Sequence, residues 1–448
     1  MIRRTVPQKT ISKESSLSGV GLHTGENVNL TFKPAPSNTG LMFIRDDING
    51  DNSIEAHIKF ISNTDRGTNL DNGVFRIHTS EHVLAALTGL DIDNCYICLD
   101  GPEVPIMDGS SKFFIEALED SKIIEQNALR EEFIPSETIS FKCEDTGSNI
   151  SLIPDDNYRV DTKVDYDTKV LGTQTASISD ISDFKNEISS ARTFSFLHEL
   201  ETLLEHGLIK GGDLNNAIVY VDKPLADSNM DRLKKAFNKD SISVTPNGIL
   251  DNLSLHYPNE AARHKLLDVI GDLALIGMKI RGKVIAEKPG HSVNAKFAKM
   301  VSEVIKNDRK NVLPKLNFDK KPLMDSNQIM NVIPHRPPFL LIDEVLELSE
   351  SHVIGLRRVE ESESWVKGHF PGAPVMPGVL QVEFMAQAGG VLVLNTVPDP
   401  ENYLTFFMKM DKCKFKDTVV PGDILICKLE LISPIRRGII HMYGQTFV

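Results

Sequence analysis

Several features are scarce or missing in this 448-residue sequence. Its cysteines are few and odd in number, which favours the reducing cytoplasm over a disulfide-stabilised secreted protein. No stretch approaches about 18 consecutive apolar residues, so we predict no membrane span. The amino terminus, MIRRTVPQKTISKESS, has no apolar run, and we therefore expect neither a signal peptide nor a membrane anchor.

Positive charge is also in short supply. Lys and Arg number 49 against 62 Asp and Glu, and the formal net charge is −13. This balance argues against nucleic acid or an anionic membrane as a general partner. The hydrophobic content of 41% is that of a soluble globular protein, and the length predicts more than one domain.

The first part of the chain has the pattern of an α+β fold. Strands are predicted in ENVNLTFKPA, GLMFIRDD and IDNCYICLD, and helices in SEHVLAALTGL, with Ser80 as N-cap and Gly89 marking the end, and in SSKFFIEALEDSKI. The same pattern recurs: strands in SETISFKC, NISLIP and YRVDTKVDY, then helices in FSFLHELETLLEHGL and EAARHKLLDVIGDLALIG. We expect two similar α/β sandwich subdomains, 1–130 and 131–305. Cys95 and Cys98 would point to opposite faces of a strand, which favours core positions over metal ligands.

Residues 306–325 are rich in Lys and Arg and lack periodicity, which is typical of a linker. The unit that follows, 326–448, contains one long apolar helix, PGVLQVEFMAQAGGVLVLN, with Pro377 in its first turn. Strands are predicted in HVIGLRRVE, LTFFMKMDKCKFKD and DILICKLELIS. This order predicts an antiparallel sheet around a central helix.

A metal site is suggested by His264 and Asp268, which lie four residues apart on one helix face. Imidazole plus carboxylate is a zinc-type donor set, and a catalytic zinc takes three protein ligands and one open position. Glu81 and His82 offer a third ligand and a carboxylate to activate water. Taken alone, such a helix pair is more often a surface or capping interaction, and iron could occupy the same donors.

Six motifs occur in one order: GVGLHTG (19–25), TSEHVLAAL (79–87), PIMDGS (105–110), ARTFSF (191–196), ARHKLLDVIGDL (262–273) and KPGHSVN (288–294). Together they resemble UDP-3-O-acyl-N-acetylglucosamine deacetylase, the zinc amidase of lipid A synthesis, over about residues 1–305. The resemblance makes His82, His264 and Asp268 the zinc ligands and Glu81 the general base.

The resemblance also assigns the remaining catalytic roles. His291 becomes the protonated group that stabilises the oxyanion and protonates the departing amine, with Asp272 holding it charged and Thr193 helping to hold the oxyanion. Phe194, Lys265 and Glu199 become substrate-binding positions. The segment 194–212 supplies apolar residues (Phe194, Phe196, Leu203, Leu204 and Leu208) for an acyl passage, although an amphipathic helix packed on a sheet would have the same stripe.

A second constellation lies in the last unit, where His369 stands fourteen residues before Glu383 in the apolar helix. Burying a carboxylate there is costly unless it is paired or protonated, so we expect a perturbed pKa for Glu383. His369 as base and Glu383 as acid suit elimination of water from a 3-hydroxyacyl thioester, with the N–H groups near Gly378 polarising its oxygen. The alternative is a buried Glu bonded to neighbouring backbone.

IPHRPPFLLIDEV (333–345), GHFPGAPVMPGVLQVEFMAQ (368–387) and FKDTVVPGD (415–423) resemble the (3R)-hydroxyacyl-[acyl-carrier-protein] dehydratases of the hot-dog fold. The resemblance implies no cofactor, an acyl carrier protein as partner, and active sites built by neighbouring subunits of a dimer or trimer of dimers. Lys412, Lys414 and Lys416 share one predicted strand face, which is either a solvated surface or a docking site for the acidic carrier protein.

The chain stops at HMYGQTFV, where the dehydratase family continues into a final strand, so that strand is expected to be missing. The leading hypothesis is a bifunctional zinc deacetylase and dehydratase acting on a UDP-linked acylated glucosamine and an acyl-carrier thioester. One alternative keeps the deacetylase and makes the hot-dog domain a non-catalytic oligomerisation scaffold. A second alternative makes the hot-dog domain a thioesterase or a dehydratase/isomerase. A third makes the first half a metal-free protein that only binds a nucleotide-sugar lipid.

Overall fold

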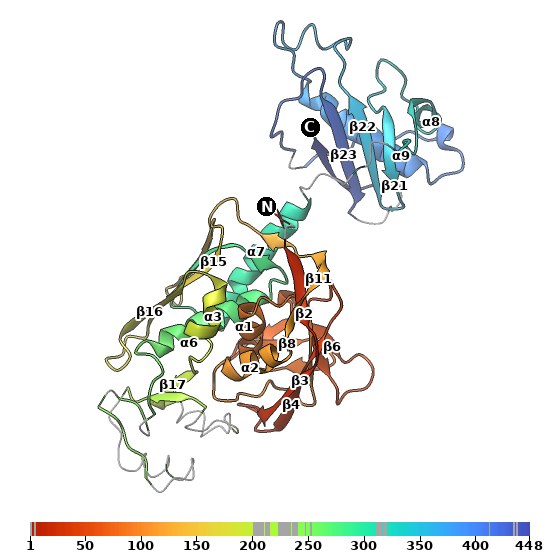
Figure 1. The fold of residues 1–448 in the computed structure, drawn as a ribbon. Helices are drawn as coiled ribbons and strands as arrows, with labels where there is room; N and C mark the ends of the chain where they lie inside the picture. The colour runs from red at the N-terminus through yellow and green to blue at the C-terminus, as the bar shows by residue number, and fades with distance from the viewer. Residues whose placement is uncertain are drawn as a thin grey trace. The chain divides into compact units, whose positions relative to one another are not determined.

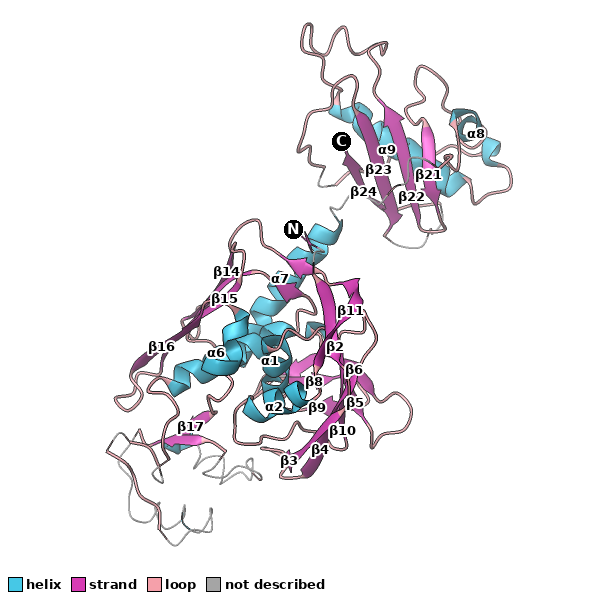
Figure 2. Cartoon of the chain, in the orientation of Figure 1, coloured by secondary structure: helices cyan, strands magenta, loops and turns pink. Residues whose placement is uncertain are grey.

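The computed structural model describes residues 2–3, 6–199, 210, 216–222, 234, 241–246, 248–250, 253–310, 316, 320–411, 413–432, 435 and 438–448. The chain forms two compact units, Met1–Lys310 and Asn311–Val448. Both combine helices and sheets (Figures 1 and 2), which confirms the α+β class.

The first unit holds two five-stranded sheets of the same design. One has the order β3 (Ser15–Val20), β4 (Asn27–Pro34), β10 (Cys95–Leu99), β5 (Leu41–Arg45), β6 (Ser53–Glu55). The other has the order β13 (Ile139–Cys143), β14 (Ser148–Ile153), β20 (Gly282–Glu287), β15 (Tyr158–Asp165), β16 (Thr173–Ile178). In each sheet the fifth strand along the chain lies centrally, and it pairs in parallel with the third and antiparallel with the second.

A helix precedes and follows the fifth strand of each sheet. These helices are α1 (Glu81–Gly89) and α2 (Lys112–Asp120) around β10, and α6 (Glu260–Ala274) and α7 (His291–Lys310) around β20. The strands alternate buried and exposed residues, as in β4, whose Val28, Leu30 and Phe32 are buried. Each sheet therefore buries one face against its helices.

Short elements complete the first unit. They are β1 (Ile2–Arg3), β2 (Pro7–Ile11), η1 (Ile58–Phe60), β7 (Ile61–Asn63), β8 (Asn69–Asp71), β9 (Arg76–Ile77), β11 (Ile123–Leu129), β12 (Glu132–Phe133), η2 (Ile181–Asp183), α3 (Phe184–Glu187), β17 (Phe194–Phe196), β18 (Ile218–Tyr220) and β19 (Lys279–Ile280). They form the small sheets β1-β12-β19, β11-β2, β17-β18 and β7-β8-β9.

Helices α1 and α6 pack against each other in the middle of the first unit, with the two large sheets on either side (Figures 1 and 2). Glycine makes this close contact possible. A Cβ atom added to Gly271 of α6 would lie 2.1 Å from the backbone oxygen of Glu81 in α1. The side chains of Glu81, His82, His264 and Asp268 therefore meet where the two helices touch.

The second unit is a four-stranded antiparallel sheet packed against a long helix. Its elements are α8 (Ser326–Met330), β21 (Glu344–Leu348), β22 (His352–Arg358), α9 (Gly378–Leu394), η3 (Pro400–Asn402), β23 (Ile424–Leu431) and β24 (Met442–Phe447), with sheet order β21-β22-β23-β24. Helix α9 contacts β22, β23 and β24, with Gly389 against Met442 and Gly444 against Met385.

The helix predicted from residue 194 onward begins too early. Phe194–Phe196 form the strand β17, because their backbone pairs in parallel with β18, and the helical residues that the structure describes in this segment begin at residue 197. The period-2 pattern of Phe-Ser-Phe is a strand pattern that the longer helical periodicity obscured. Leu203, Leu204 and Leu208 lie outside the described residues.

The strand predicted in LTFFMKMDKCKFKD is also wrong for residues 404–411 and 413–417, which contain no strand. A strand needs a neighbour for its N–H and C=O groups, and this segment pairs with no other in the described part of the chain. Its apolar side chains are exposed instead, among them Phe406 and Met408. Lys412 lies outside the described residues.

Ser80 precedes α1 as expected, but its side chain does not cap the helix. Its backbone is helical, and its hydroxyl donates to the carbonyl oxygen of Thr68 at 2.8 Å. The strand prediction for Cys95 and Cys98 is confirmed, and both thiols are buried and free. Among the described residues, no helix is long and apolar enough to cross a membrane.

Candidate active sites

Three buried side chains converge at the contact of α1 and α6. The Nε2 atoms of His264 and His82 lie 3.4 Å and 3.8 Å from Oδ1 of Asp268. His82, His264 and Asp268 each place one potential ligand atom within 4.8 Å of those of the other two. Oδ1 of Asp268 has no hydrogen-bond partner among the described residues. A buried carboxylate oxygen without a donor, facing two imidazoles, fits the coordination of a cation.

The two histidines of this cluster are held in the neutral form. Nδ1 of His264 donates to the carbonyl oxygen of Ala191 at 3.1 Å, which leaves the lone pair of Nε2 facing the cluster. Burial lowers the pKa of His82 to about 3, with the neighbouring His264 acting in the same direction. Burial also lowers the pKa of His264. Both rings are therefore uncharged at neutral pH.

Asp268 is held as an anion by the lysine one turn before it. Burial opposes ionisation, but Lys265 and His264 outweigh it and lower the pKa of Asp268. Nζ of Lys265 donates to Oδ2 of Asp268 at 2.8 Å, so Oδ1 is the oxygen left for a cation. The same ammonium lies 5.6 Å from the centre of the Phe194 ring, and that ring packs edge-on against His264.

Glu81 stands beside the cluster with a pKa suited to accepting a proton. Its side chain is 3% exposed, and burial raises its pKa to about 7, helped by the negative charges of Asp272 and Asp268. Its Oε2 accepts a hydrogen bond from the backbone N–H of Thr68 at 2.9 Å. A carboxylate with a pKa near 7 is a good general base at neutral pH.

His291, at the start of α7, is held in its protonated form. Its Nδ1 lies 3.0 Å from Oδ2 of Asp272. Burial works against the charged ring, but Asp272, Asp268 and Glu81 outweigh it and raise the pKa of His291 to about 9. Its Nε2 lies 3.9 Å from both Oε1 of Glu81 and Oδ2 of Asp268. A protonated imidazole thus lies next to Glu81 and the cluster.

A buried ion pair fixes the segment that carries Thr193 and Phe194. The backbone N–H and Nε of Arg192 donate to Oε1 of Glu260 at 3.1 Å and 2.8 Å, which ties this segment to the start of α6. The N–H of Thr193 donates to the carbonyl of Gly109 at 2.8 Å. Glu199, the other expected substrate-binding residue, accepts from the N–H of Phe196 at 3.3 Å.

Two neighbours of the cluster were not selected from the sequence. Thr68 contacts both Glu81 and Asp272, and Asn294 donates to Oδ2 of Asp272 at 2.8 Å. Asn294 lies in the KPGHSVN motif one turn after His291, and that spacing could have revealed it. Thr68 has no such local signal.

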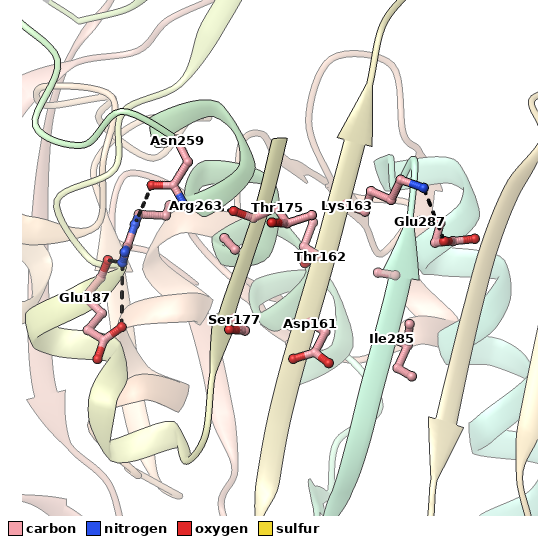
Figure 3. Close-up of a pocket in the computed structure, with 12 residues that line it drawn as sticks. Asp161, Thr162, Lys163, Thr175, Ser177, Glu187, Asn259, Arg263, Ile285 and Glu287 are labelled. Carbon is pink, nitrogen blue, oxygen red and sulfur yellow. Dashed lines mark hydrogen bonds and ion pairs between the residues drawn. The ribbon is translucent and has the colours of Figure 1, made fainter. Parts of the chain in front are cut away.

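A hollow of about 460 Å³ lies elsewhere on the first unit, over β15, β16 and β20 (Figure 3). Its lining is mostly polar and includes the ion pairs Arg263–Glu187 and Lys163–Glu287. None of the lining residues is a predicted ligand or catalytic residue. The hollow is therefore distinct from the cluster of His82, His264 and Asp268.

In the second unit, Glu383 is bonded to side chains rather than to backbone. Nε2 of Gln387, one turn later on α9, donates to its Oε1 at 2.9 Å, and Nε2 of His335 lies 3.4 Å from the same oxygen. Neither residue was selected from the sequence. Gln387 also accepts from the N–H of Leu341 at 2.7 Å, which fixes its amide.

His369 lies in the loop before α9, where its Nδ1 is 2.7 Å from the carbonyl oxygen of Val375 and its ring stacks on Phe370. Since the carbonyl can only accept, Nδ1 carries the proton and Nε2 is left as the basic atom. Within the described residues of one chain, no hydrogen bond or ion pair joins His369 to Glu383. At the start of α9, the ring of Phe415 lies against Gly378.

Comparisons with known proteins agree with this two-unit arrangement. The family model for UDP-3-O-acyl N-acetylglycosamine deacetylase, LpxC, matches residues 8–237 and 225–303, and the FabA-like domain matches residues 333–448. The bifunctional enzyme LpxC/FabZ of Bacteroides thetaiotaomicron is 45% identical over 441 residues, 98% of this chain and 95% of that protein.

Two further relatives are similar. The bifunctional enzyme LpxC/FabZ of Chlorobaculum tepidum is 41% identical over 449 residues, 99% of this chain and 96% of its own. The UDP-3-O-acyl-N-acetylglucosamine deacetylase of Myxococcus xanthus is 38% identical over 296 residues, 66% of this chain and 86% of its own. The two bifunctional relatives thus match both units of this chain. The Myxococcus xanthus deacetylase matches a stretch about as long as the first unit.

Proposed function

Since the chain belongs to the family of bifunctional LpxC/FabZ enzymes, we propose that its two units catalyse separate reactions. The first hydrolyses the N-acetyl group of a UDP-3-O-(3-hydroxyacyl)-N-acetylglucosamine in lipid A biosynthesis. The second dehydrates (3R)-hydroxyacyl-[acyl-carrier-protein] to trans-2-enoyl-[acyl-carrier-protein] in fatty acid biosynthesis. The observation that carries the first activity is the buried group of His82, His264 and Asp268 with Glu81 and His291 beside it.

Zinc is the metal that we assign to this cluster. Two neutral imidazoles and one carboxylate match a catalytic zinc set, and the unpartnered Oδ1 of Asp268 would be satisfied by the ion. Iron suits the same donors and is the alternative. When bound, the ion supplies Lewis acidity, which polarises the amide carbonyl and makes a water more acidic.

The protein's own side chains would move the protons of amide hydrolysis. Glu81 accepts a proton from the water whose oxygen attacks the amide carbon. The C–N bond then breaks, and Nε2 of His291 donates its proton to the departing amine, since an unprotonated amide nitrogen is a poor leaving group. The hydroxyl of Thr193 would donate a hydrogen bond to the oxyanion. Asp272 keeps His291 charged through its Nδ1.

Phe194, Lys265 and Glu199 are proposed to bind the substrate. The ring of Phe194 lies against His264 and under Lys265, and it packs with Tyr166 and Tyr220 at centroid distances of 5.6 Å and 5.8 Å. This aromatic cluster beside the metal ligands is apolar enough to contact an acyl chain.

In the second unit, Nε2 of His369 would remove the proton from C2 of the thioester, and Glu383 would protonate the departing hydroxyl. The N–H groups at Gly378, the first residue of α9, would polarise the thioester oxygen. No cofactor is needed for this elimination. Because no hydrogen bond or ion pair joins His369 to Glu383 among the described residues of one chain, a second subunit is proposed to complete each site.

The proposed organisation follows from these roles. It comprises deacetylase subdomains at 1–130 and 131–305, a linker at 306–325 and a hot-dog domain at 326–448. The first residues of this linker, 306–310, continue helix α7. The hot-dog domain is proposed to form a dimer or trimer of dimers through the exposed apolar side chains between Tyr403 and Phe415. Lys414 and Lys416 would face an acidic acyl carrier protein, and the enzyme is expected to act in the cytoplasm.

Metal removal tests the proposal for the first unit. A chelator should abolish acetate release from the UDP-sugar lipid while leaving enoyl-thioester formation intact, and added Zn²⁺ should restore the lost activity. Metal analysis should find zinc in the unmodified chain and little in a His264→Ala variant. Deacetylation that survives complete metal removal would refute the zinc assignment.

A further inference from the structure

Thr68 connects the base and the acid of the first unit, although it lies far from both along the sequence. It is fully buried, with 0% of its surface exposed. Its backbone N–H donates to Oε2 of Glu81 at 2.9 Å, and its hydroxyl lies 2.5 Å from Oδ1 of Asp272. One residue thus touches the carboxylate of the base and the carboxylate behind the acid.

The hydrogen bonds around Asp272 have a defined direction. A carboxylate can only accept, so the Thr68 hydroxyl donates to Oδ1, while Nδ1 of His291 and Nδ2 of Asn294 donate to Oδ2. With its proton on Nδ1 fixed in this way, His291 presents Nε2 to Glu81 and Asp268. Without the Thr68 hydroxyl, Oδ1 would be buried with no donor, and Asp272 could rotate away from His291.

Thr68 is itself held firmly. Its carbonyl oxygen accepts from the N–H and the hydroxyl of Ser80 at 3.2 Å and 2.8 Å. The residue before it, Gly67, has φ of +157°, and a Cβ added there would lie 3.0 Å from Oε1 of Glu81. Glycine therefore lets the Thr68 backbone approach the Glu81 carboxylate.

We propose that Thr68 is a positioning residue for deacetylation, whose hydroxyl orients the Asp272–His291 pair relative to the base Glu81. Its backbone N–H and its hydroxyl together fix the spacing of base and acid. The inference rests on the proposed deacetylase function and assigns a role to a residue that acts through Glu81 and the Asp272–His291 pair.

A Thr68→Val variant tests the hydroxyl alone, because valine keeps the shape, the β-branch and the backbone N–H. We expect kcat for deacetylation to fall by about 10- to 100-fold, as for other groups that orient a catalytic residue. KM and zinc content should stay unchanged, because Thr68 binds neither substrate nor metal. Thr68→Ser, which keeps the donor, should restore most of the lost rate.

Spectroscopy separates positioning from a general loss of structure. The imidazole ¹⁵N signals of His291 should shift in Thr68→Val and return in Thr68→Ser, while the thermal unfolding temperature of the first unit changes little. Thr162→Val is the matched control, because Thr162 is 2% exposed and its hydroxyl has no partner among the described residues. It should keep both the rate and the His291 signals.

The outcomes are distinct. A Thr68→Val enzyme with unchanged kcat, or a loss of rate that Thr68→Ser shares, would overturn the inference. So would a loss explained by missing zinc or by unfolding. If the unmodified chain itself does not deacetylate, the proposed function fails, and the His291 signals still report whether Thr68 orients that ring.

Discussion

At the scale of single residues, the buried surroundings raise the pKa values of Glu81 and His291, the proposed base and acid, for different reasons. The pKa of Glu81 is raised to about 7 mainly by burial, because the charged carboxylate is poorly solvated there. Burial lowers the pKa of His291, but Asp272 and the other nearby carboxylates outweigh this effect and raise that pKa to about 9. Glu81 is therefore unprotonated while His291 is protonated only over a limited pH range.

Deacetylation is expected to follow a bell-shaped pH profile. The base must be ionised, so the rate is lost as the pH falls through the pKa of Glu81, at or below about 7, since a bound cation lowers it further. The acid must be protonated, so the rate is lost as the pH rises through about 9, the pKa of His291. Measuring kcat/KM against pH tests both limbs.

A control separates these limbs from unfolding. Circular dichroism at each pH should show the first unit still folded where the rate has fallen. A rate that keeps rising well above pH 9 would contradict the role of His291 as the acid.

The sequence predicted part of this chemistry at the residue scale. The four-residue spacing of His264 and Asp268 placed both on one helix face, and the structure brings His82 to them. Thr68 could not be found in this way, because it lies 13 residues from Glu81 and 204 from Asp272. Such a contact arises only from the tertiary fold.

At the scale of elements, the contact of α1 and α6 depends on Gly271. In an isolated helix, Gly→Ala would stabilise by about 1 kcal/mol. Here the new Cβ would meet the backbone of Glu81 at 2.1 Å, and α1 and α6 would have to separate. The proposed metal ligands lie on both helices, so a change in the packing of α1 and α6 should also change metal binding.

Gly271→Ala is therefore expected to destabilise the first unit by about 2 kcal/mol or more, as overpacking does, and to weaken zinc binding. Urea unfolding followed by circular dichroism, together with a zinc titration, measures both effects. Gly290→Ala is the control: its Cβ meets nothing within 4 Å, and the loss should stay below about 1 kcal/mol. A gain in stability for Gly271→Ala would show that the helices do not approach this closely.

Elements with a strong local pattern were predicted well, and those that depend on a distant partner were not. The alternating strand β4 and the amphipathic helix α6 follow from their own residues. Phe194–Phe196 became a strand through pairing with Ile218–Tyr220, more than twenty residues away. Residues 404–411 have a strand-like sequence but no partner strand in the described part of the chain.

At the scale of the whole molecule, the first unit repeats one topology without a visible sequence repeat. Helices α1 and α6, which precede the fifth strands β10 and β20, are equivalent in this repeat. Each contributes at least one residue to the cluster of His82, His264 and Asp268. The sequence predicted two units of similar design but could not show their strand order. That order depends on long-range pairing such as that of β10 with β5.

The second unit is expected to self-associate. Phe406 and Met408 are 80% and 81% exposed, and large apolar side chains gathered in one segment favour burial between copies. Analytical ultracentrifugation should find a dimer or a larger assembly. The double variant Phe406→Asp, Met408→Asp should shift it towards monomer, reduce dehydration and preserve deacetylation. A monomeric unmodified chain that still dehydrates would contradict the shared site.

The most direct test of the two-enzyme account is turnover of both substrates by the purified chain, beside His82→Ala and His369→Ala variants. The account predicts that His82→Ala abolishes deacetylation alone and that His369→Ala abolishes dehydration alone. Deacetylation that persists in His82→Ala would contradict the metal site. An unmodified chain that deacetylates but never dehydrates would make the second unit a scaffold.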